Sequence, residues 1–147
     1  MSFTLREATR QDLPNVLALY AQPGMDDGNV LSLAEAEAVH ARFAHYPSYR
    51  LFIVCDGDAV VGTYALLVMD NLAHQGTPSA IVEDVVVAPG RQGQGIGRRM
   101  MAHAMGLARA AGCYKLALSS NRRREAAHAF YESLGFTQHG LSFSVVL

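Results

Sequence analysis

A glycine-rich turn between an apolar strand and an amphipathic helix is the segment best suited to bind an anion. Gly93, Gly95 and Gly97 alternate with other residues soon after the apolar run Val85–Val87. The first turn of a helix carries unpaired N–H groups and the positive end of the helix dipole, and glycines let a phosphate approach that backbone closely. The spacing fits neither the dinucleotide-binding nor the P-loop pattern, but it fits Gln92-x-x-Gly95-x-Gly97. We therefore expect either a phosphate-binding turn or a purely structural one.

Two carboxylates interrupt an otherwise apolar strand before that turn. Glu83 and Asp84 lie within the β-branched run Ile81–Val87. Because neighbouring strand residues face opposite sides, only one of the two is expected to face a given cleft. A carboxylate in a buried strand is costly unless it is paired or functional, so the alternatives are an ion pair with a neighbouring arginine and a role in proton transfer.

A tyrosine near the C-terminus is a further side chain suited to proton transfer. Phe130 and Leu134 form an apolar i, i+4 pair, and Tyr131 points off that stripe, either into a cleft or along a helix edge. A phenol has a reference pKa of about 10 and a thiol one of about 8.5, so a tyrosine can usefully protonate a leaving thiolate.

The distribution of charge along the chain indicates an anionic ligand for the C-terminal half. The formal net charge is −1, yet residues 1–84 hold four Arg against eleven Asp and Glu, whereas residues 85–147 hold eight Arg and Lys against two Glu. Such asymmetry between halves is typical of a protein whose basic part binds an anion. No nucleic-acid partner is expected, because a phosphate site at the turn accounts for much of the positive charge.

Length and composition exclude several classes of protein. The 147 residues predict one domain, 1–147, and the 50% hydrophobic share excludes disorder. No apolar run approaches the ~20 residues of a transmembrane helix, and the N-terminus lacks the apolar segment of a signal peptide, so we expect no membrane partner. The His and Cys residues show no metal-ligand spacing, so no metal is expected, and Cys55 and Cys113 are expected to be reduced thiols of a cytoplasmic protein.

The elements that position these groups follow from hydrophobic periodicity, helix caps and turn residues. Antiparallel hairpins come first and a strand–turn–helix–strand crossover follows, which predicts an α+β (mixed α/β) fold. The last strand alternates Phe143, Val145 and Leu147, which could pair across a homodimer interface or pack in the core. Strands are expected at 3–6, 51–55, 59–69, 81–87, 114–118, 136–139 and 142–147, and helices at 12–20, 33–45, 95–111 and 124–134.

Two motifs, in this order, resemble the GNAT acetyltransferase family. The Gln92-x-x-Gly95-x-Gly97 turn resembles that family's acetyl-CoA pyrophosphate loop, and residues 130–136 resemble its Y-x-x-x-G-F signature. The resemblance covers essentially the whole chain. It implies a GNAT-like fold, with a central mixed, mostly antiparallel sheet of splayed strands flanked by about four helices. It also implies an acetyl-CoA cosubstrate whose pantetheine arm lies between strands 81–87 and 114–118.

By the same resemblance, the cofactor-binding residues come from the strand end, the turn and the last helix. Backbone N–H groups from Gln92 to Gly97 would hold the pyrophosphate, and one near Val87 would stabilise the negative charge that develops on the carbonyl oxygen. The family usually has Asn where this chain has Arg124, so Ser119, Ser120 or Asn121 could take over that contact. The full set is Val85, Val86, Val87, Arg91, Gln92, Gly93, Gln94, Gly95, Ile96, Gly97, Arg98, Asn121, Arg124, Ala127 and Tyr131.

The resemblance also implies the catalytic roles. Tyr131 would be the general acid that protonates the leaving thiolate. Glu83, with Asp84 as its rival, would take the proton of the amine, directly or through water.

These observations predict an acetyl-CoA-dependent N-acetyltransferase that transfers the acetyl group directly to a primary amine of a small molecule. Residues 118–131 resemble aminoalkylphosphonate N-acetyltransferases, and residues 82–87 resemble glucosamine-6-phosphate N-acetyltransferases. The acceptor could therefore bear a phosphonate or phosphate, bound by Arg122–Arg124. The alternatives for that run are a solvated charge cluster and binding of the nucleotide 3′-phosphate of the cosubstrate. The alternatives are a protein or peptide N-acetyltransferase and a non-catalytic acyl-CoA-binding sensory module.

Overall fold

The computed structural model describes residues 2–147, which form two compact units. The first unit extends to Ala117 and contains a β-sheet with helices on both faces. The second unit is Leu118–Leu147 and contains one helix, α4.

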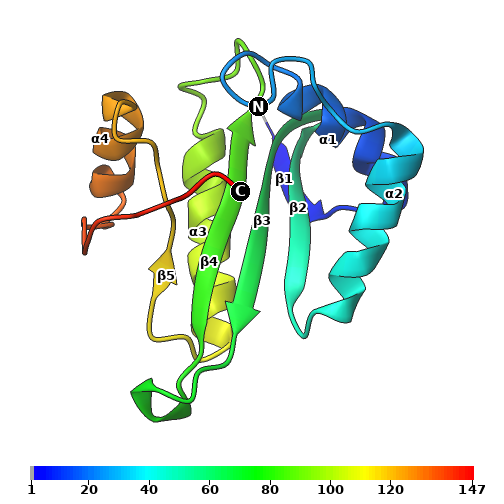
Figure 1. Ribbon diagram of the computed structural model, residues 1–147. Helices are drawn as coiled ribbons and strands as arrows, with labels where there is room; N and C mark the ends of the chain where they lie inside the picture. Colours follow the sequence, from blue (N-terminus) through cyan, green and yellow to red (C-terminus); the bar gives the residue numbers. More distant parts are fainter. Residues whose placement is uncertain (1) are drawn as a thin grey trace. The chain divides into compact units, whose positions relative to one another are not determined.

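The sheet of the first unit has five strands, whose order in space follows their order in the chain (Figure 1). Each strand from β1 to β3 pairs antiparallel with the next, and β5 pairs parallel with β4. Hairpins can join antiparallel neighbours, whereas the parallel pair needs the crossover through α3. This is the predicted mixed, mostly antiparallel sheet. The strands are β1 (Phe3–Glu7), β2 (Tyr49–Asp56), β3 (Ala59–Met69), β4 (Ser79–Val87) and β5 (Leu116–Ala117).

Strands β4 and β5 pair only over a short stretch. Two register pairs, Ala80 with Leu116 and Ile81 with Ala117, join them, although β4 continues to Val87. The remainder of β4 pairs with β3 within the first unit. β5 is therefore shorter than the predicted strand 114–118, and the splay of the two strands stays a prediction.

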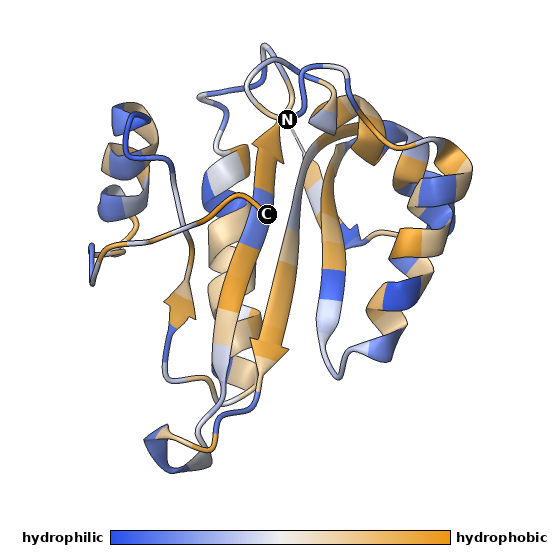
Figure 2. Cartoon of the chain, in the orientation of Figure 1, coloured by the Kyte–Doolittle hydropathy of each residue, from blue (hydrophilic) through white to orange (hydrophobic). Residues whose placement is uncertain are grey.

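Helices α1 and α2 cover one face of the sheet, and α3 covers the other. Val16 of α1 and Ala36 of α2 belong to the same buried cluster as Ile53 of β2. On the opposite face, the hydroxyl of Tyr64 lies 2.6 Å from Nδ1 of His103 in α3. Figure 2 shows the apolar strands that lie between these helical layers. The α-helices are α1 (Leu13–Tyr20), α2 (Leu33–Arg42) and α3 (Ile96–Ala110), and the short 3-10 helices are Arg10–Asp12, Phe43–His45 and His74–Gly76.

A capping box begins α2, as the sequence predicts. The hydroxyl of Ser32 accepts a hydrogen bond from the Glu35 backbone N–H at 3.2 Å, and the Glu35 carboxylate accepts from the Ser32 backbone N–H at 3.4 Å. These bonds satisfy donors that a helix N-terminus otherwise leaves unpaired.

A β-bulge interrupts β4 at its carboxylates. Ala65 of β3 pairs with Glu83, but Thr63 pairs with Val86, so Asp84 and Val85 lie opposite one residue of β3. Asp84 takes a φ of +53°, in the left-handed region that aspartate tolerates better than most residues. An inserted residue breaks the alternation of a strand. The alternation from which the facing of the two carboxylates was predicted is therefore interrupted at Asp84 and Val85, and which carboxylate faces the cleft stays a prediction.

The second unit differs from the sequence prediction after its helix. Helix α4 (Glu125–Ser133) lies within the predicted range 124–134, but none of the described residues beyond it is in a strand. The predicted strands 136–139 and 142–147 are therefore wrong. Phe143 and Val145 are 89% and 79% exposed, so the predicted core position of that segment is also wrong. Alternating apolar residues suit a strand, but a strand also requires a partner edge.

No helix among residues 2–147 is both long enough and apolar enough to cross a membrane.

Candidate active site

The turn between β4 and α3 presents a series of backbone N–H groups at a helix N-terminus. Gly93 and Gly95 have φ values of +79° and +83°, and Gly95 is the N-cap residue of α3. Arg91 and Arg99 donate their backbone N–H groups to Ala88 and Gly95. Among the described residues, none of the backbone N–H groups from 92 to 98 donates a hydrogen bond to a turn or cap carbonyl. The predicted anion-binding residues 91–98 are thus contiguous around the positive end of a 15-residue helix.

Two contacts hold this turn against the sheet. A Cβ atom on Gly62 of β3 would lie 2.8 Å from Cγ2 of Ile96, so glycine is needed for α3 to begin this close to the sheet. The guanidinium of Arg91 donates to Asp56 at 2.7 Å. Arg91 is therefore partly neutralised and anchors the turn to the end of β2, a role that its sequence position did not reveal.

The end of β4 supplies backbone rather than side chains to this region. Val86 is buried to 5% exposure and belongs to the core. The carbonyl of Val87 accepts a hydrogen bond from Gln22 at 3.3 Å, which ties the segment after α1 to β4. The predicted contribution of Val85–Val87 can therefore come from main-chain groups next to the bulge.

Both β4 carboxylates act electrostatically on Tyr49. The pKa of Tyr49, raised mainly by burial, is raised further by the charges of both Asp84 and Glu83. Asp84 is exposed as a whole residue, yet burial of its carboxyl group raises its pKa, and the nearby Asp26 carboxylate raises it further. Neither Glu83 nor Asp84 forms an ion pair with a described residue. The alternative that one of these carboxylates pairs with a neighbouring arginine is therefore wrong for the described residues.

Two tyrosines complete what we call the β4 acidic cluster: Tyr20, Asp26, Tyr49, Glu83 and Asp84. Burial raises the pKa of Tyr20, and the charge of Asp84 raises it further, while a hydrogen bond with Thr63 opposes the shift. Tyr49 stacks on Phe43 with ring centroids 4.0 Å apart. Sequence reasoning missed both tyrosines. Tyr20 continues the apolar stripe of α1, and Tyr49 lies just before the predicted strand 51–55, where no neighbouring motif marks it as functional.

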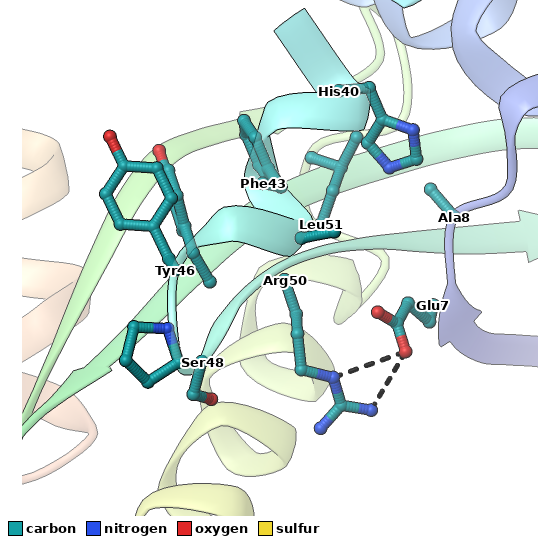
Figure 3. A pocket seen from close by; sticks show the side chains of 11 residues that line it. Glu7, Ala8, His40, Phe43, Tyr46, Ser48, Arg50 and Leu51 are labelled. Carbon is teal, nitrogen blue, oxygen red and sulfur yellow. Dashed lines mark hydrogen bonds and ion pairs between the residues drawn. The ribbon is translucent and has the colours of Figure 1, made fainter.

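Two cavities lie beside this cluster in the first unit. The larger, about 380 Å³, is lined by aromatic and polar side chains between the end of α2 and the start of β2, including His40 and Tyr46 (Figure 3). Tyr49, the first residue of β2, also lines it. Its Arg50 guanidinium donates twice to one carboxylate oxygen of Glu7, at 3.2 and 3.0 Å, so this pair is neutral overall. The smaller cavity, about 210 Å³, lies between α1 and α2 and is mostly apolar, with Tyr20 and Asp26 among its lining residues.

In the second unit, the candidate acid Tyr131 shares one face of α4 with Arg124, Ala127 and His128. These residues stand at spacings of three, four and seven, which place them on the same side of a helix. Tyr131 is half-buried and packs edge-on to Phe136 at a centroid distance of 5.8 Å. Burial raises the pKa of its phenol, and the positive charge of Arg124 opposes that rise.

Polar groups before α4 fix the start of that helix. The imidazole Nε2 of His128 lies 2.8 Å from the carbonyl oxygen of Asn121, which can only accept, so Nε2 is the donor. The Asn121 side chain accepts the Arg123 backbone N–H at 2.9 Å. The hydroxyl of Ser120 is buried without a hydrogen-bond partner among the described residues. Of the three neighbours considered for the missing Asn contact, Ser120 is the one whose side-chain oxygen is buried without a partner in the part of the chain that the structure describes.

Residues 2–147 contain no group of three or more His, Cys, Asp or Glu side chains arranged to hold a metal ion. Both Cys55 and Cys113 are free thiols.

Comparison with known proteins places the whole arrangement in a family. The sequence profile described as "Acetyltransferase (GNAT) family" matches residues 14–136. Aminoalkylphosphonate N-acetyltransferase of Salmonella typhimurium is 32% identical over 143 residues, which cover 97% of this chain and 90% of the relative. Glucosamine 6-phosphate N-acetyltransferase of Trypanosoma brucei brucei is 29% identical over 117 residues, which cover 79% and 71%.

A solved structure extends the likeness to the fold. A protein from Agrobacterium tumefaciens strain C58 is 38% identical, covers 98% of this chain and 99% of its own, and superposes with a TM-score of 0.90.

Proposed function

Because the chain belongs to the GNAT family of acetyltransferases, we propose that it transfers the acetyl group of acetyl-CoA directly to a primary amine of a small molecule. The observation that carries this proposal is the turn at residues 91–98, where left-handed glycines and the N-terminus of α3 present unpaired N–H groups. The free thiols Cys55 and Cys113 support a cytoplasmic location.

The residues of the turn fit the pyrophosphate of acetyl-CoA. Added Cβ atoms at Gly93 and Gly95 would meet no atom within 4 Å, so the backbone of the turn faces open space. Arg98 is exposed and forms no ion pair with a described residue, which leaves its charge available to a phosphate. When bound, acetyl-CoA supplies an activated acetyl group on a thiol leaving group.

The β4 acidic cluster supplies the base. An amine must lose its proton to attack a carbonyl carbon, and a carboxylate near a tyrosine-lined surface can accept that proton directly or through water. Glu83 is the proposed base and Asp84 its rival. Negative charge at the cluster also attracts a protonated amine to this part of the sheet.

A pair of isosteric variants separates the two carboxylates. Glu83→Gln is expected to lower kcat by about 10²-fold, because it removes a general base. Asp84→Asn, which keeps a residue that tolerates the left-handed φ, is expected to change kcat far less. The reverse result, measured by acetyl-CoA-dependent thiol release under saturating substrates, would assign the base to Asp84.

Tyr131 is the proposed acid. Its O–H gives its proton to the leaving sulfur, which would otherwise depart as a thiolate. Burial raises the pKa of this phenol, so it stays protonated at neutral pH and is able to donate.

For the acceptor, we propose a small amine that bears a phosphonate or phosphate. The two curated relatives named above act, by their names, on an aminoalkylphosphonate and on glucosamine 6-phosphate. Arg122 and Arg123 form no ion pair with a described residue and could bind an oxyanion in a bidentate manner. The arginine of the larger cavity, Arg50, is already paired with Glu7 and is a poorer candidate.

Thiol release from acetyl-CoA, measured against a panel of amines, tests both the reaction and the acceptor class. We expect turnover with aminoalkylphosphonates or amino sugar phosphates, and slower turnover with the matching amines that lack phosphorus. Turnover only with peptides would favour a protein N-acetyltransferase. Tight binding of acetyl-CoA without turnover of any acceptor would favour an acyl-CoA-binding sensory module.

A further inference from the structure

Arg124 occupies an unusual place for a cation. It is the N-cap residue of α4, where the helix dipole is positive and where acidic or hydroxyl side chains are preferred. Its side chain makes no capping hydrogen bond, and among the described residues it forms no ion pair. Glu125 supplies the acidic residue of the first turn in its stead. Capping of the helix therefore gives no reason for an arginine at this position.

The backbone of Arg124 is held firmly at this place. Its N–H donates to the Asn121 carbonyl at 2.9 Å, and its own carbonyl accepts the N–H of His128 at 3.1 Å. The His128 ring donates to the same Asn121 carbonyl at 2.8 Å. The start of the helix is thus fixed by three bonds, and with it the direction in which the Arg124 side chain leaves the backbone.

Helical spacing places Arg124 on the face of α4 that carries Tyr131. Seven residues make almost two helical turns, so Arg124 and Tyr131 lie on one face about two turns apart. A long arginine side chain can bridge much of that distance over the intervening Ala127. His128 and Glu132 are the neighbouring titratable groups on the helix, but Arg124 is the residue whose charge acts on the Tyr131 phenol.

We propose that Arg124 is a positioning residue that acts through Tyr131: its guanidinium stabilises the phenolate that Tyr131 becomes on giving up its proton. In that step the C–S bond breaks and its electron pair stays on sulfur. The Tyr131 O–H bond also breaks, its proton forms the S–H bond, and its electron pair remains on the phenolate oxygen. Solvent then returns a proton to the phenolate. The inference rests on the proposed role of Tyr131 as the acid.

The first test is a titration that does not depend on activity. Protein labelled with ¹³C at Cζ of tyrosine is titrated by NMR, and the Tyr131 signal is assigned by its loss in Tyr131→Phe. Arg124→Gln is expected to move the Tyr131 midpoint to higher pH, because a positive charge that favours the phenolate is removed. Arg124→Lys should restore most of the effect. The matched control is Arg122→Gln, which removes the same charge from the same arginine run.

An equal shift in Arg122→Gln and Arg124→Gln would overturn the proposal, because net charge alone would then explain it. No shift in Arg124→Gln would also overturn it.

The second test is kinetic. Arg124→Gln is expected to lower kcat by about 2- to 10-fold and to move the alkaline limb of the kcat profile upward, since a weaker acid donates less readily but stays protonated to higher pH. In a Tyr131→Phe background, the same substitution should have no further effect on kcat. A rise in KM for acetyl-CoA with kcat unchanged would assign Arg124 to cofactor phosphate binding and overturn the proposal.

The two tests separate this inference from the proposed function. If Arg124→Gln shifts the Tyr131 titration but Tyr131→Phe retains full kcat, the role of Tyr131 as acid is wrong. If Tyr131→Phe loses activity but the titration does not respond to Arg124, only the present inference fails.

Discussion

The segment β4–turn–α3 and the segment after α4 show different relations between sequence and structure. In the first, the predicted strand 81–87 and helix 95–111 correspond closely to Ser79–Val87 and Ile96–Ala110. In the second, the two predicted strands after α4 do not form within the described residues. The turn depends on its own glycines and on the helix it begins, whereas a strand at 142–147 depends on a partner edge that its own residues do not specify.

The largest expected effect is a loss of kcat, and it tests whether a residue of the second unit takes part in catalysis. Tyr131→Phe removes one oxygen and its proton while keeping the ring that packs on Phe136. We expect kcat to fall by about 10²-fold, with the Kd for acetyl-CoA nearly unchanged, because only proton donation is lost. Steady-state kinetics and calorimetric titration measure the two quantities. Tyr114→Phe, a change of the same size at an exposed tyrosine, is the control.

An unchanged kcat in Tyr131→Phe would contradict this prediction, because the second unit would then not supply the acid.

The next effect tests the dependence of the turn on local backbone conformation. Gly95→Ala places a Cβ at a φ of +83°, which costs about 1–2 kcal/mol. Relaxation of the turn would misplace its N–H groups, so the Kd for acetyl-CoA should rise by about tenfold.

The matched control is Gly106→Ala, inside α3. An added Cβ there would meet nothing within 4 Å, and alanine stabilises a helix interior by about 1 kcal/mol relative to glycine. Its Tm should rise and its Kd stay constant. Equal affinity in Gly95→Ala and Gly106→Ala would show that the left-handed conformation at Gly95 is not needed for binding.

A smaller effect concerns stability at the bulge. The folded protein raises the pKa of Asp84 above its unfolded value, so ionisation of Asp84 costs stability as pH rises through the folded pKa. Asp84→Asn should therefore stabilise the protein at pH 7, by less than about 1 kcal/mol because the residue is exposed. The gain should vanish below the unfolded aspartate pKa of about 3.9. Denaturant unfolding at pH 7 and pH 3 measures it, and a gain that persists at pH 3 would contradict a charge effect.

The smallest effect tests the second segment directly. Phe143 is 89% exposed, so Phe143→Ser should change the free energy of unfolding by no more than about 0.5 kcal/mol. Ile53→Ala, at a residue with 0% exposure in β2, should cost about 2–5 kcal/mol in the same assay. A loss of several degrees in the Tm of Phe143→Ser would show that the segment after α4 packs after all.

The features of the candidate site that could be predicted from the sequence are those that depend on residues close together in the chain. Residues 91–98 and the capping box at Ser32 were predictable, because each depends on residues within a few positions of one another. The bulge at Asp84 was not, since it is a mismatch in register between β3 and β4 that neither strand shows alone. The contact of Arg91 with Asp56 joins residues 35 positions apart and had no sequence signal.

By itself the sequence determined the order of elements in the first unit, the glycine turn, the helix caps and the family of the chain, because periodicity and backbone preference act over short distances. Only the tertiary structure decided that Tyr20 and Tyr49 lie within electrostatic reach of Asp84, that a bulge interrupts β4 at Asp84, and that β5 pairs with β4 over two residues. Those features arise from register and pairing between distant segments, which depend on the packing of the whole sheet rather than on any one stretch of residues.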